Sequence, residues 1–170
     1  MTIAIGIRAS DGIVIAADRE EGDGYLTNDR GKILQSFRGT DPIGWIGIAG
    51  AGDGPAIDEV AKLLTNRFCA DTERTPELVR ATLRNEHRAY YKTTILPLAG
   101  LPQLERPDYS LIIGCLEGGL GKSLFATSKL SFNESSDYEA VGVGATVANN
   151  WLERLYDYMP VSCAIRLARM

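Results

Sequence analysis

Alternating apolar and polar residues open the chain, and a turn interrupts them. Residues 2–8 (TIAIGIR) alternate, residues 10–12 (SDG) supply a turn, and residues 13–17 (IVIAA) form a second apolar run. This pattern around an Asp-Gly turn is typical of a β-hairpin. The pattern also predicts short strands at residues 32–37 and 43–50, two strands around a turn within residues 108–128, and one or two more within residues 129–145.

Two consecutive segments carry apolar residues at helical spacing. Within residues 56–68 the predicted buried side is made of Ile57, Val60, Ala61, Leu64 and Phe68. Residues 75–94 start with a threonine cap and a proline, so we expect a second helix there. It carries Leu78, Leu83, His87 and Tyr90 or Tyr91 along one side. Residues 95–107 contain three prolines and are expected to form a loop, while residues 147–159 and 160–170 are predicted helices.

The order of the predicted elements is strands, two helices, strands, two helices. Adjacent strands joined by hairpins favour antiparallel sheets, and consecutive helices can cover the outer faces of those sheets. The sequence therefore predicts an α+β fold. Its 170 residues are interpreted as one globular domain spanning residues 1–170.

Composition narrows the possible partners. The net charge is -4, with 18 basic and 22 acidic residues, and the basic residues are scattered, so we expect no nucleic-acid partner. Three cysteines without C-x-x-C spacing and a single histidine imply neither a disulfide framework nor a metal site. The pattern contains no signal peptide and no run of 18 apolar residues, so we expect a cytoplasmic protein without a membrane span.

Two glycine-rich segments resemble nucleotide-binding motifs but lack a required glycine. GGLGKS at residues 118–123 would need a glycine where Leu116 stands, and the following LFATS suggests a strand instead of a helix. A G-x-G-x-x-G motif starting at Gly50 would need a glycine where Pro55 stands. The turn at Gly50 and Gly52 keeps two interpretations: N–H groups that stabilise negative charge near a helix start, or a packing turn.

His87 is the only histidine, and we expect it on the surface or half-buried on its helix. Any Ser-His-Asp or Cys-His mechanism would have to use it, which makes both mechanisms poor hypotheses. A threonine with a free α-amine needs no histidine, because that amine has an ordinary pKa of about 7.7 to 8.0 and can act as the general base.

The start of the chain resembles a known enzyme family at this point. TIAIGIRASDGIVIAADRE is similar to the start of mature proteasome β subunits and of HslV, which are threonine-type N-terminal nucleophile (Ntn) hydrolases. By position, Thr2 corresponds to the family nucleophile once Met1 is removed, Asp18 to the family acid, and Lys32 to the active-site lysine. The segment IAGAGD matches the turn that supplies an oxyanion N–H, assigned to Gly50, with Gly47 as the alternative.

The resemblance implies a mechanism and an assembly. Lys32, held by Asp18, would lower the pKa of the Thr2 amine and favour its proton-accepting form. The N–H of Gly50 would receive the oxyanion, a contribution worth about 3 kcal/mol for one such donor. The family fold is a four-layer α-β-β-α sandwich. Its subunits form homo-oligomeric rings that cleave polypeptide substrates, in some cases with an ATPase unfoldase, and need no cofactor.

Two departures from the family pattern leave other hypotheses open. Val143 stands where the family usually has a serine that contacts the threonine amine, and the chain ends within a predicted helix at Met170, so we expect the family's last strands to be missing. A catalytically inactive ring or scaffold subunit is one alternative to a threonine peptidase. A small-substrate amidase of the same superfamily is another.

Overall fold

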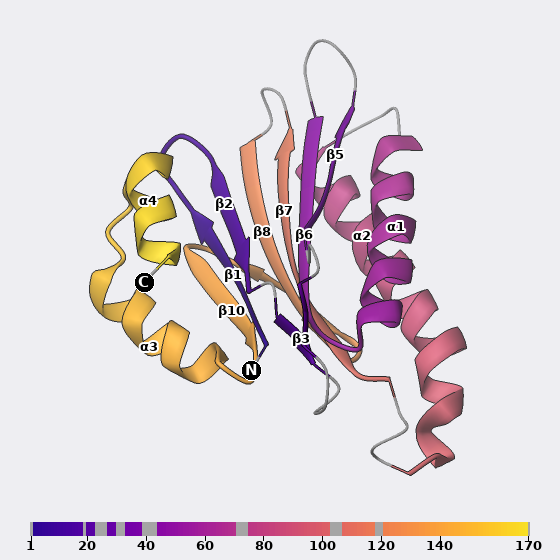
Figure 1. Ribbon diagram of the computed structural model, residues 1–170. Coiled ribbons are helices and arrows are strands. Elements are labelled where there is room, and N and C mark those ends of the chain that lie inside the picture. Colours follow the sequence, from indigo (N-terminus) through magenta and orange to yellow (C-terminus); the bar gives the residue numbers. More distant parts are fainter. Residues whose placement is uncertain are drawn as a thin grey trace.

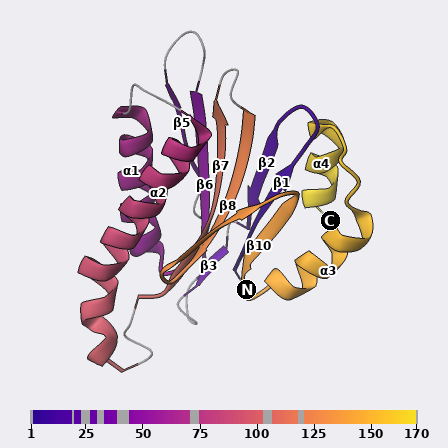
Figure 2. The ribbon, with the colours of Figure 1, turned by 180° about the vertical axis from the view of Figure 1, so that it is seen from behind.

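Two β-sheets pack face to face, and a pair of helices covers each outer face, in the computed structural model (Figure 1). The same four layers are seen from behind in Figure 2. The structure describes residues 2–18, 20–22, 27–29, 33–38, 44–70, 75–102, 107–117 and 121–169. The α+β class and the four-layer sandwich of antiparallel sheets expected from the sequence are therefore confirmed.

The smaller sheet contains the predicted N-terminal hairpin. Its antiparallel strands, in the order β10-β1-β2, span Tyr138–Gly142, Ile3–Arg8 and Ile13–Ala17. In β1 the isoleucines Ile5 and Ile7 face one covering helix pair, whereas Ala4 faces the larger sheet. A side chain on Gly6 would overlap Leu124 of the larger sheet, so the small residues of β1 let the two sheets approach closely.

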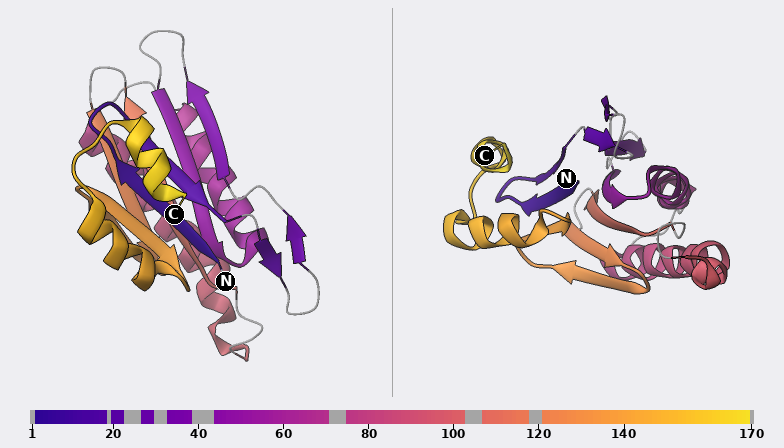
Figure 3. Two further views of the ribbon diagram at one scale, coloured as in Figure 1. Left: turned by 60° about the vertical axis from the view of Figure 1, so that its left-hand side comes forward. Right: turned by 60° about the horizontal axis from the view of Figure 1, so that its bottom comes forward.

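The larger sheet has five antiparallel strands in the order β5-β6-β7-β8-β9, which span Ile33–Arg38, Gly44–Gly52, Tyr109–Glu117, Gly121–Ser128 and Ser131–Ser135. The strands predicted at residues 32–37 and 43–50 correspond to β5 and β6, and Lys32 itself lies outside the described residues. LFATS belongs to β8, as predicted when the phosphate-loop interpretation was rejected. β3 (Glu20–Gly22) and β4 (Thr27–Asp29) form a separate pair beside the sandwich (Figure 3).

Helices α1 (Gly54–Ala70) and α2 (Pro76–Tyr90) cover the larger sheet. In α1 most of the predicted positions are buried, and Asp53 caps the helix because its Oδ1 accepts from the N–H of Ala56 at 2.9 Å. Thr75 caps α2 as predicted, through its Oγ1 and the N–H of Leu78. The buried side of α2 differs by one position from the prediction: it contains Val79, and Leu78 is 44% exposed.

The loop predicted at residues 95–107 is wrong over its first half. The backbone stays helical beyond α2, first as the π-helix η1 (Tyr91–Ile95) and then as the 3-10 helix η2 (Leu96–Gly100). The N–H of Leu96 bonds to the carbonyl of Tyr91, and Pro97 follows within the first turn of η2, where a missing N–H costs least. A change of helix type therefore accommodates the proline that the sequence pattern treated as a helix end.

Helices α3 (Ala145–Leu155) and α4 (Val161–Ala168) cover the outer face of the smaller sheet. Both helices were predicted, but α3 ends at Leu155 and not at the predicted residue 159. Tyr156, just after α3, donates its hydroxyl to the carbonyl of Arg8 at 2.7 Å, and the N–H of Val161 bonds to Asp11 at 2.7 Å. These contacts fix both helices to the β1–β2 hairpin. Among the helices that the structure describes, none has the length and apolar character needed to cross a membrane.

The predicted surface or half-buried position of His87 is also wrong. Its side chain is 0% exposed and packs edge-on against Tyr109 of β7, with ring centroids 5.9 Å apart, and against Phe132 of β9 at 6.0 Å. Burial lowers the pKa of His87 from 6.5 to about 4, and the neighbouring charge of Arg88 adds to this shift. His87 is thus a neutral core residue between α2 and the larger sheet.

Candidate active site

The β1–β2 hairpin brings Thr2 and Asp18 to the same end of the smaller sheet. Its register pairs Ala4 with Ala17, so the residues just beyond the paired positions lie opposite each other. The N–H of Ile3 donates to Oδ2 of Asp18 at 3.1 Å, and the N–H of Asp18 donates to the carbonyl of Ile3 at 3.1 Å. Asp18 therefore holds the backbone immediately after Thr2, and two of the predicted site residues are neighbours.

Strand β10 approaches Thr2 from the other side of β1. Gly142, the last residue of β10, pairs with Ile3. A Cβ built on Gly142 would overlap the carbonyl oxygen of Thr2 and would lie 2.8 Å from Cβ of Ala51 in β6. The first residue of the described chain, the end of β10 and the end of β6 consequently meet at one corner between the two sheets (Figure 1).

Gly50 lies at this end of β6, one residue before Ala51. The pairing of β5 with β6 ends at Ile33 and Ala49, whereas the pairing with β7 continues to Gly52. A Cβ on Gly50 would lie 2.6 Å from the side chain of Ile57, so this position needs glycine for close packing of β6 against α1. Gly47, the alternative assignment, lies within the paired part of β6.

The turn that contains Gly50 and Gly52 leads into α1. At the start of α1 the N–H of Ala56 already bonds to the carboxylate of Asp53. Gly52 has a φ of +120° and packs against the backbone of Asp108 and Tyr109, so it is required by the turn itself. Negative charge at the start of α1 is therefore supplied by Asp53. Gly52 serves the packing of the turn, and the oxyanion role of the Gly50 N–H stays a prediction.

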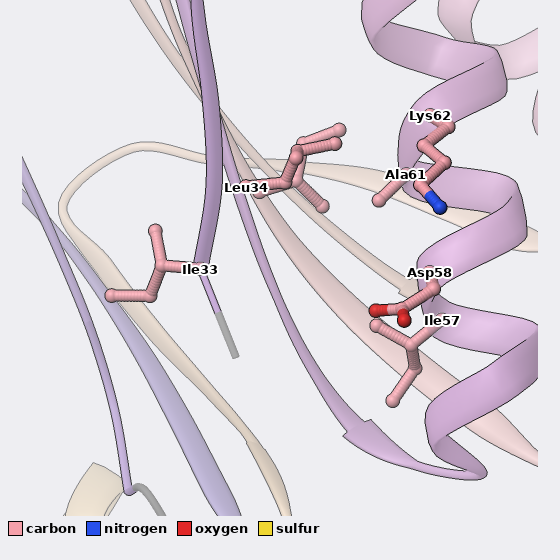
Figure 4. A pocket seen from close by; sticks show the side chains of 7 residues that line it. Ile33, Leu34, Ile57, Asp58, Ala61 and Lys62 are labelled. Atoms are coloured by element: carbon pink, nitrogen blue, oxygen red, sulfur yellow. The ribbon is translucent and has the colours of Figure 1, made fainter. Parts of the chain in front are cut away.

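A small pocket of about 60 Å³ lies between β5 and α1 (Figure 4), and Ile57 in its lining is the side chain that packs over Gly50. Ile48 and Ile57 contribute to its apolar wall, while Leu34 and Ala61 point into the space between β5 and α1. Asp58 and Lys62 of α1 supply its charged groups. The complete lining consists of Ile33, Leu34, Ile48, Ile57, Asp58, Ala61 and Lys62. The pocket is sized for one small side chain.

A larger groove of about 400 Å³ lies on the outer face of β1, between α3 and α4. Its lining is almost entirely apolar, with Trp151 and Leu155 of α3 on one side and Arg169 as its charged residue. It offers no nucleophile or acid–base pair. In the described part of the chain no cluster of His, Cys, Asp and Glu side chains is arranged to hold a metal ion.

The structure describes Val143 but neither Lys32 nor Met1. The lysine's predicted role and the removal of Met1 therefore stay predictions. Val143, at the position of the family serine, is 82% exposed and follows Gly142 directly. Sequence reasoning missed Gly142, and the available signal was the G-x-G spacing of residues 142–144.

Comparisons with known proteins identify the family and the fold of the chain. A family model described as "Proteasome subunit" matches residues 2–170. The "Proteasome subunit beta" of Nanoarchaeum equitans (strain Kin4-M) is 29% identical over 173 residues, which cover 99% of this chain and 81% of that protein.

Solved structures show the same fold. Anbu, described as an ancestral β-subunit, from Yersinia bercovieri superposes with a TM-score of 0.75 at 18% identity, covering 98% of this chain and 71% of that chain. A helical assembly of the Anbu complex from Pseudomonas aeruginosa gives a TM-score of 0.70 at 20% identity, with the same coverage. Because the family model spans nearly every residue, this chain belongs to the proteasome subunit family.

Proposed function

We propose that the chain is a threonine-type peptidase in which Thr2, freed of Met1, is the nucleophile. The observation that carries the proposal is the Asp18 carboxylate held at the Ile3 amide, directly beside Thr2, at the corner that the end of β6 also reaches. In this proposal Asp18 orients Lys32, and the N–H of Gly50 is the oxyanion donor. Membership of the proteasome subunit family supports these assignments.

The reaction would proceed by covalent catalysis. The Thr2 hydroxyl oxygen bonds to the substrate carbonyl carbon while its proton passes to the Thr2 α-amine. The amide C–N bond then breaks as the departing amine takes up that proton, leaving an ester on Thr2. A water molecule, deprotonated by the same amine, hydrolyses the ester and restores the hydroxyl. A positive charge at Lys32 would keep the pKa of the amine low enough for this role at neutral pH.

Substrate and assembly are part of the same proposal. We assign unfolded polypeptide as the substrate, a homo-oligomeric ring as the working form, and residues 1–170 as one catalytic domain in the cytoplasm, with an ATPase unfoldase as a candidate partner. The small pocket between β5 and α1 would receive an apolar side chain of the substrate. The relatives described as a proteasome β subunit and as an Anbu assembly support a multi-subunit form.

One observation favours a second candidate, a catalytically inactive ring subunit. Val143 offers no hydrogen-bonding side chain where the family usually has a serine, and it is 82% exposed. An inactive subunit would keep the fold and the assembly surfaces without hydrolysing peptides. The two candidates differ in their requirement for a free Thr2 amine.

The deciding experiment combines N-terminal mass spectrometry with peptide hydrolysis. We expect Met1 to be absent from the purified protein, and hydrolysis of fluorogenic peptides and of unfolded casein to disappear in Thr2→Ala. Thr2→Ser retains a hydroxyl and is expected to stay active, so it controls for effects on folding. Lys32→Ala should lower kcat with little change in stability. Retained Met1 together with no hydrolysis would favour the inactive subunit, and hydrolysis by Thr2→Ala would refute the assigned nucleophile.

A further inference from the structure

Gly142 touches both halves of the proposed active site although it carries no side chain. As the last residue of β10 it pairs with Ile3, the residue after the proposed nucleophile. A Cβ at this position would overlap the carbonyl oxygen of Thr2 and lie 3.1 Å from the carbonyl carbon. On its other side the same Cβ would lie 2.8 Å from Cβ of Ala51, the neighbour of Gly50.

The backbone of Gly142 gives a second, independent requirement for glycine. Its φ is +100°, a conformation that residues with a Cβ rarely adopt. Gly121 has a similar φ of +116° at the start of β8, but a Cβ there would meet nothing within 4 Å. The two glycines share the positive φ. Of the two, only a Cβ at Gly142 would contact Thr2 and Ala51.

Gly144 is the reverse of Gly121, because it has an ordinary backbone conformation but little space for a side chain. Its φ is -82°, which any residue adopts. A Cβ on Gly144 would lie 3.1 Å from Cδ1 of Ile3, the flexible end of a side chain, and its nearest contacts do not include the Thr2 backbone. Gly144 therefore offers crowding beside β1 without backbone strain.

We infer that Gly142 is a positioning residue that sets the distance between Thr2 and the Gly50 segment of β6. Carbon atoms in contact prefer about 3.5 to 4.0 Å, so a methyl group at 142 must move Ala51 or the Thr2 carbonyl by about 1 Å. The Thr2 carbonyl carbon is bonded to the Cα that carries both the hydroxyl side chain and the amine. A shift there misplaces the nucleophile and its base together relative to the oxyanion donor.

This inference rests on the proposed function for its catalytic consequence. Active sites tolerate little displacement, since about 1 Å can cost roughly a hundredfold in rate. We expect Gly142→Ala to lower kcat by about a hundredfold with KM for a fluorogenic peptide nearly unchanged. Gly121→Ala and Gly144→Ala are the matched controls, and both should keep the kcat of the wild-type protein. Equal kcat in Gly142→Ala and wild type, or an equal loss in Gly121→Ala, would overturn the inference.

A double variant separates positioning from packing and covers poor folding of the single variant. Ala51→Gly in the Gly142→Ala background removes the contact with β6 and leaves the contact with Thr2. We expect the double variant to regain only part of its stability against urea, because the strained φ of residue 142 remains, and kcat to stay low, because the overlap with the Thr2 carbonyl remains. Recovery of kcat together with stability would mean that Gly142 serves packing alone, and the inference would be wrong.

A second readout does not depend on hydrolysis. The Ile3 N–H bonds to Asp18 directly beside Thr2, so its hydrogen exchange, followed by NMR, reports the position of this backbone. Gly142→Ala should speed exchange at Ile3 relative to Ile112 in the core, and Gly121→Ala should not. A uniform change at both amides would refute the positioning role. If wild-type protein with a free Thr2 hydrolyses nothing, the proposed function fails, and the exchange result still decides the role of Gly142.

Discussion

Acid should destabilise this protein through its single histidine. His87 is fully buried, and within the described chain neither of its ring nitrogens has a hydrogen-bond partner. The phenol ring of Tyr109 packs against His87, and the rings of Tyr90 and Tyr91 pack against Tyr109, whose pKa is itself raised by burial. Arg88, the next residue, adds a positive charge instead of a compensating negative one. A protonated imidazole would therefore be unfavourable in this core.

The direction of the effect follows from the two pKa values of His87. Above pH 6.5 the imidazole is neutral in both folded and unfolded chains, so it contributes nothing to the pH dependence. Below pH 6.5 the unfolded chain binds a proton, while the folded chain does so only near its pKa of about 4. The unfolded state then holds more protons, and stability falls as the pH falls.

The size of the effect comes from the same values. A shift from 6.5 to about 4 corresponds to about 3 kcal/mol of unfolding free energy, lost mostly between pH 6.5 and 4. This is a large share of the roughly 5–15 kcal/mol that stabilises an ordinary domain. Because carboxylates also titrate in this range, the wild-type curve alone cannot isolate the histidine.

The contribution of His87 is isolated by urea unfolding of wild type and His87→Phe, measured from pH 7 to pH 4. Phenylalanine extends the aromatic cluster with Phe132 and cannot bind a proton. At pH 7 the free energies of unfolding of the two proteins are expected to differ only through the packing of the new side chain. The variant should then gain on wild type by about 3 kcal/mol as the pH reaches 4. Parallel stability curves for the two proteins over this range would refute the reasoning.

Two further predictions concern local contacts. The Asp53 carboxylate caps α1 because it accepts a hydrogen bond from the N–H of Ala56. Asp53→Ala should therefore lower the free energy of unfolding in urea at pH 7 by about 1 kcal/mol. An unchanged midpoint would contradict the capping role. The Lys122 ammonium donates to the carbonyl of Ala9 at 2.7 Å and to the hydroxyl of Tyr158 at 3.2 Å, so Lys122→Met should lose about 1–2 kcal/mol. Lys92→Met on the exposed side of η1 is the control, and an equal loss there would contradict the prediction.

The sequence pattern predicted most of the helices and strands, because each depends on the spacing of apolar residues that are close in the sequence. The β1–β2 hairpin followed from alternation around one turn, and α1 from apolar residues three and four positions apart. On α2 the spacing placed Leu83, His87 and Tyr90 on one side of the helix, but the neighbouring Arg88 favoured a surface or half-buried position for His87. The aromatic ring contacts that accommodate His87 come from β7 and β9, which lie far from it in the sequence.

In the candidate site, too, contacts within one hairpin were predictable, and contacts between distant segments were not. The nearness of Thr2 and Asp18 was predictable, because a hairpin with this register places the residues just past its paired ends opposite each other. The G-x-G spacing of residues 142–144 marked Gly142 as unusual, but its position beside Thr2 was not predictable, since it depends on β10 pairing with β1 across most of the chain. The η1–η2 segment was missed because a proline ends an α-helix in the sequence pattern but is accepted in the first turn of a 3-10 helix.

The position of Thr2 at the very start of a strand poses a physical problem, because strand ends and chain ends fray. Reciprocal hydrogen bonds between Ile3 and Asp18 hold β1 on one side, and the pairing of Ile3 with Gly142 holds it on the other. Both restraints act on backbone atoms, so they fix the site without occupying the Thr2 side chain. In the proposed function the Thr2 nucleophile must meet a separate oxyanion donor on β6, and it would benefit from such restraint because the ordering entropy is lost during folding and not during the reaction. Stability at this corner and the rate of the proposed reaction should therefore both fall in single variants of Asp18 and Gly142, whereas a variant of the α1 cap at Asp53 should lose stability without losing rate.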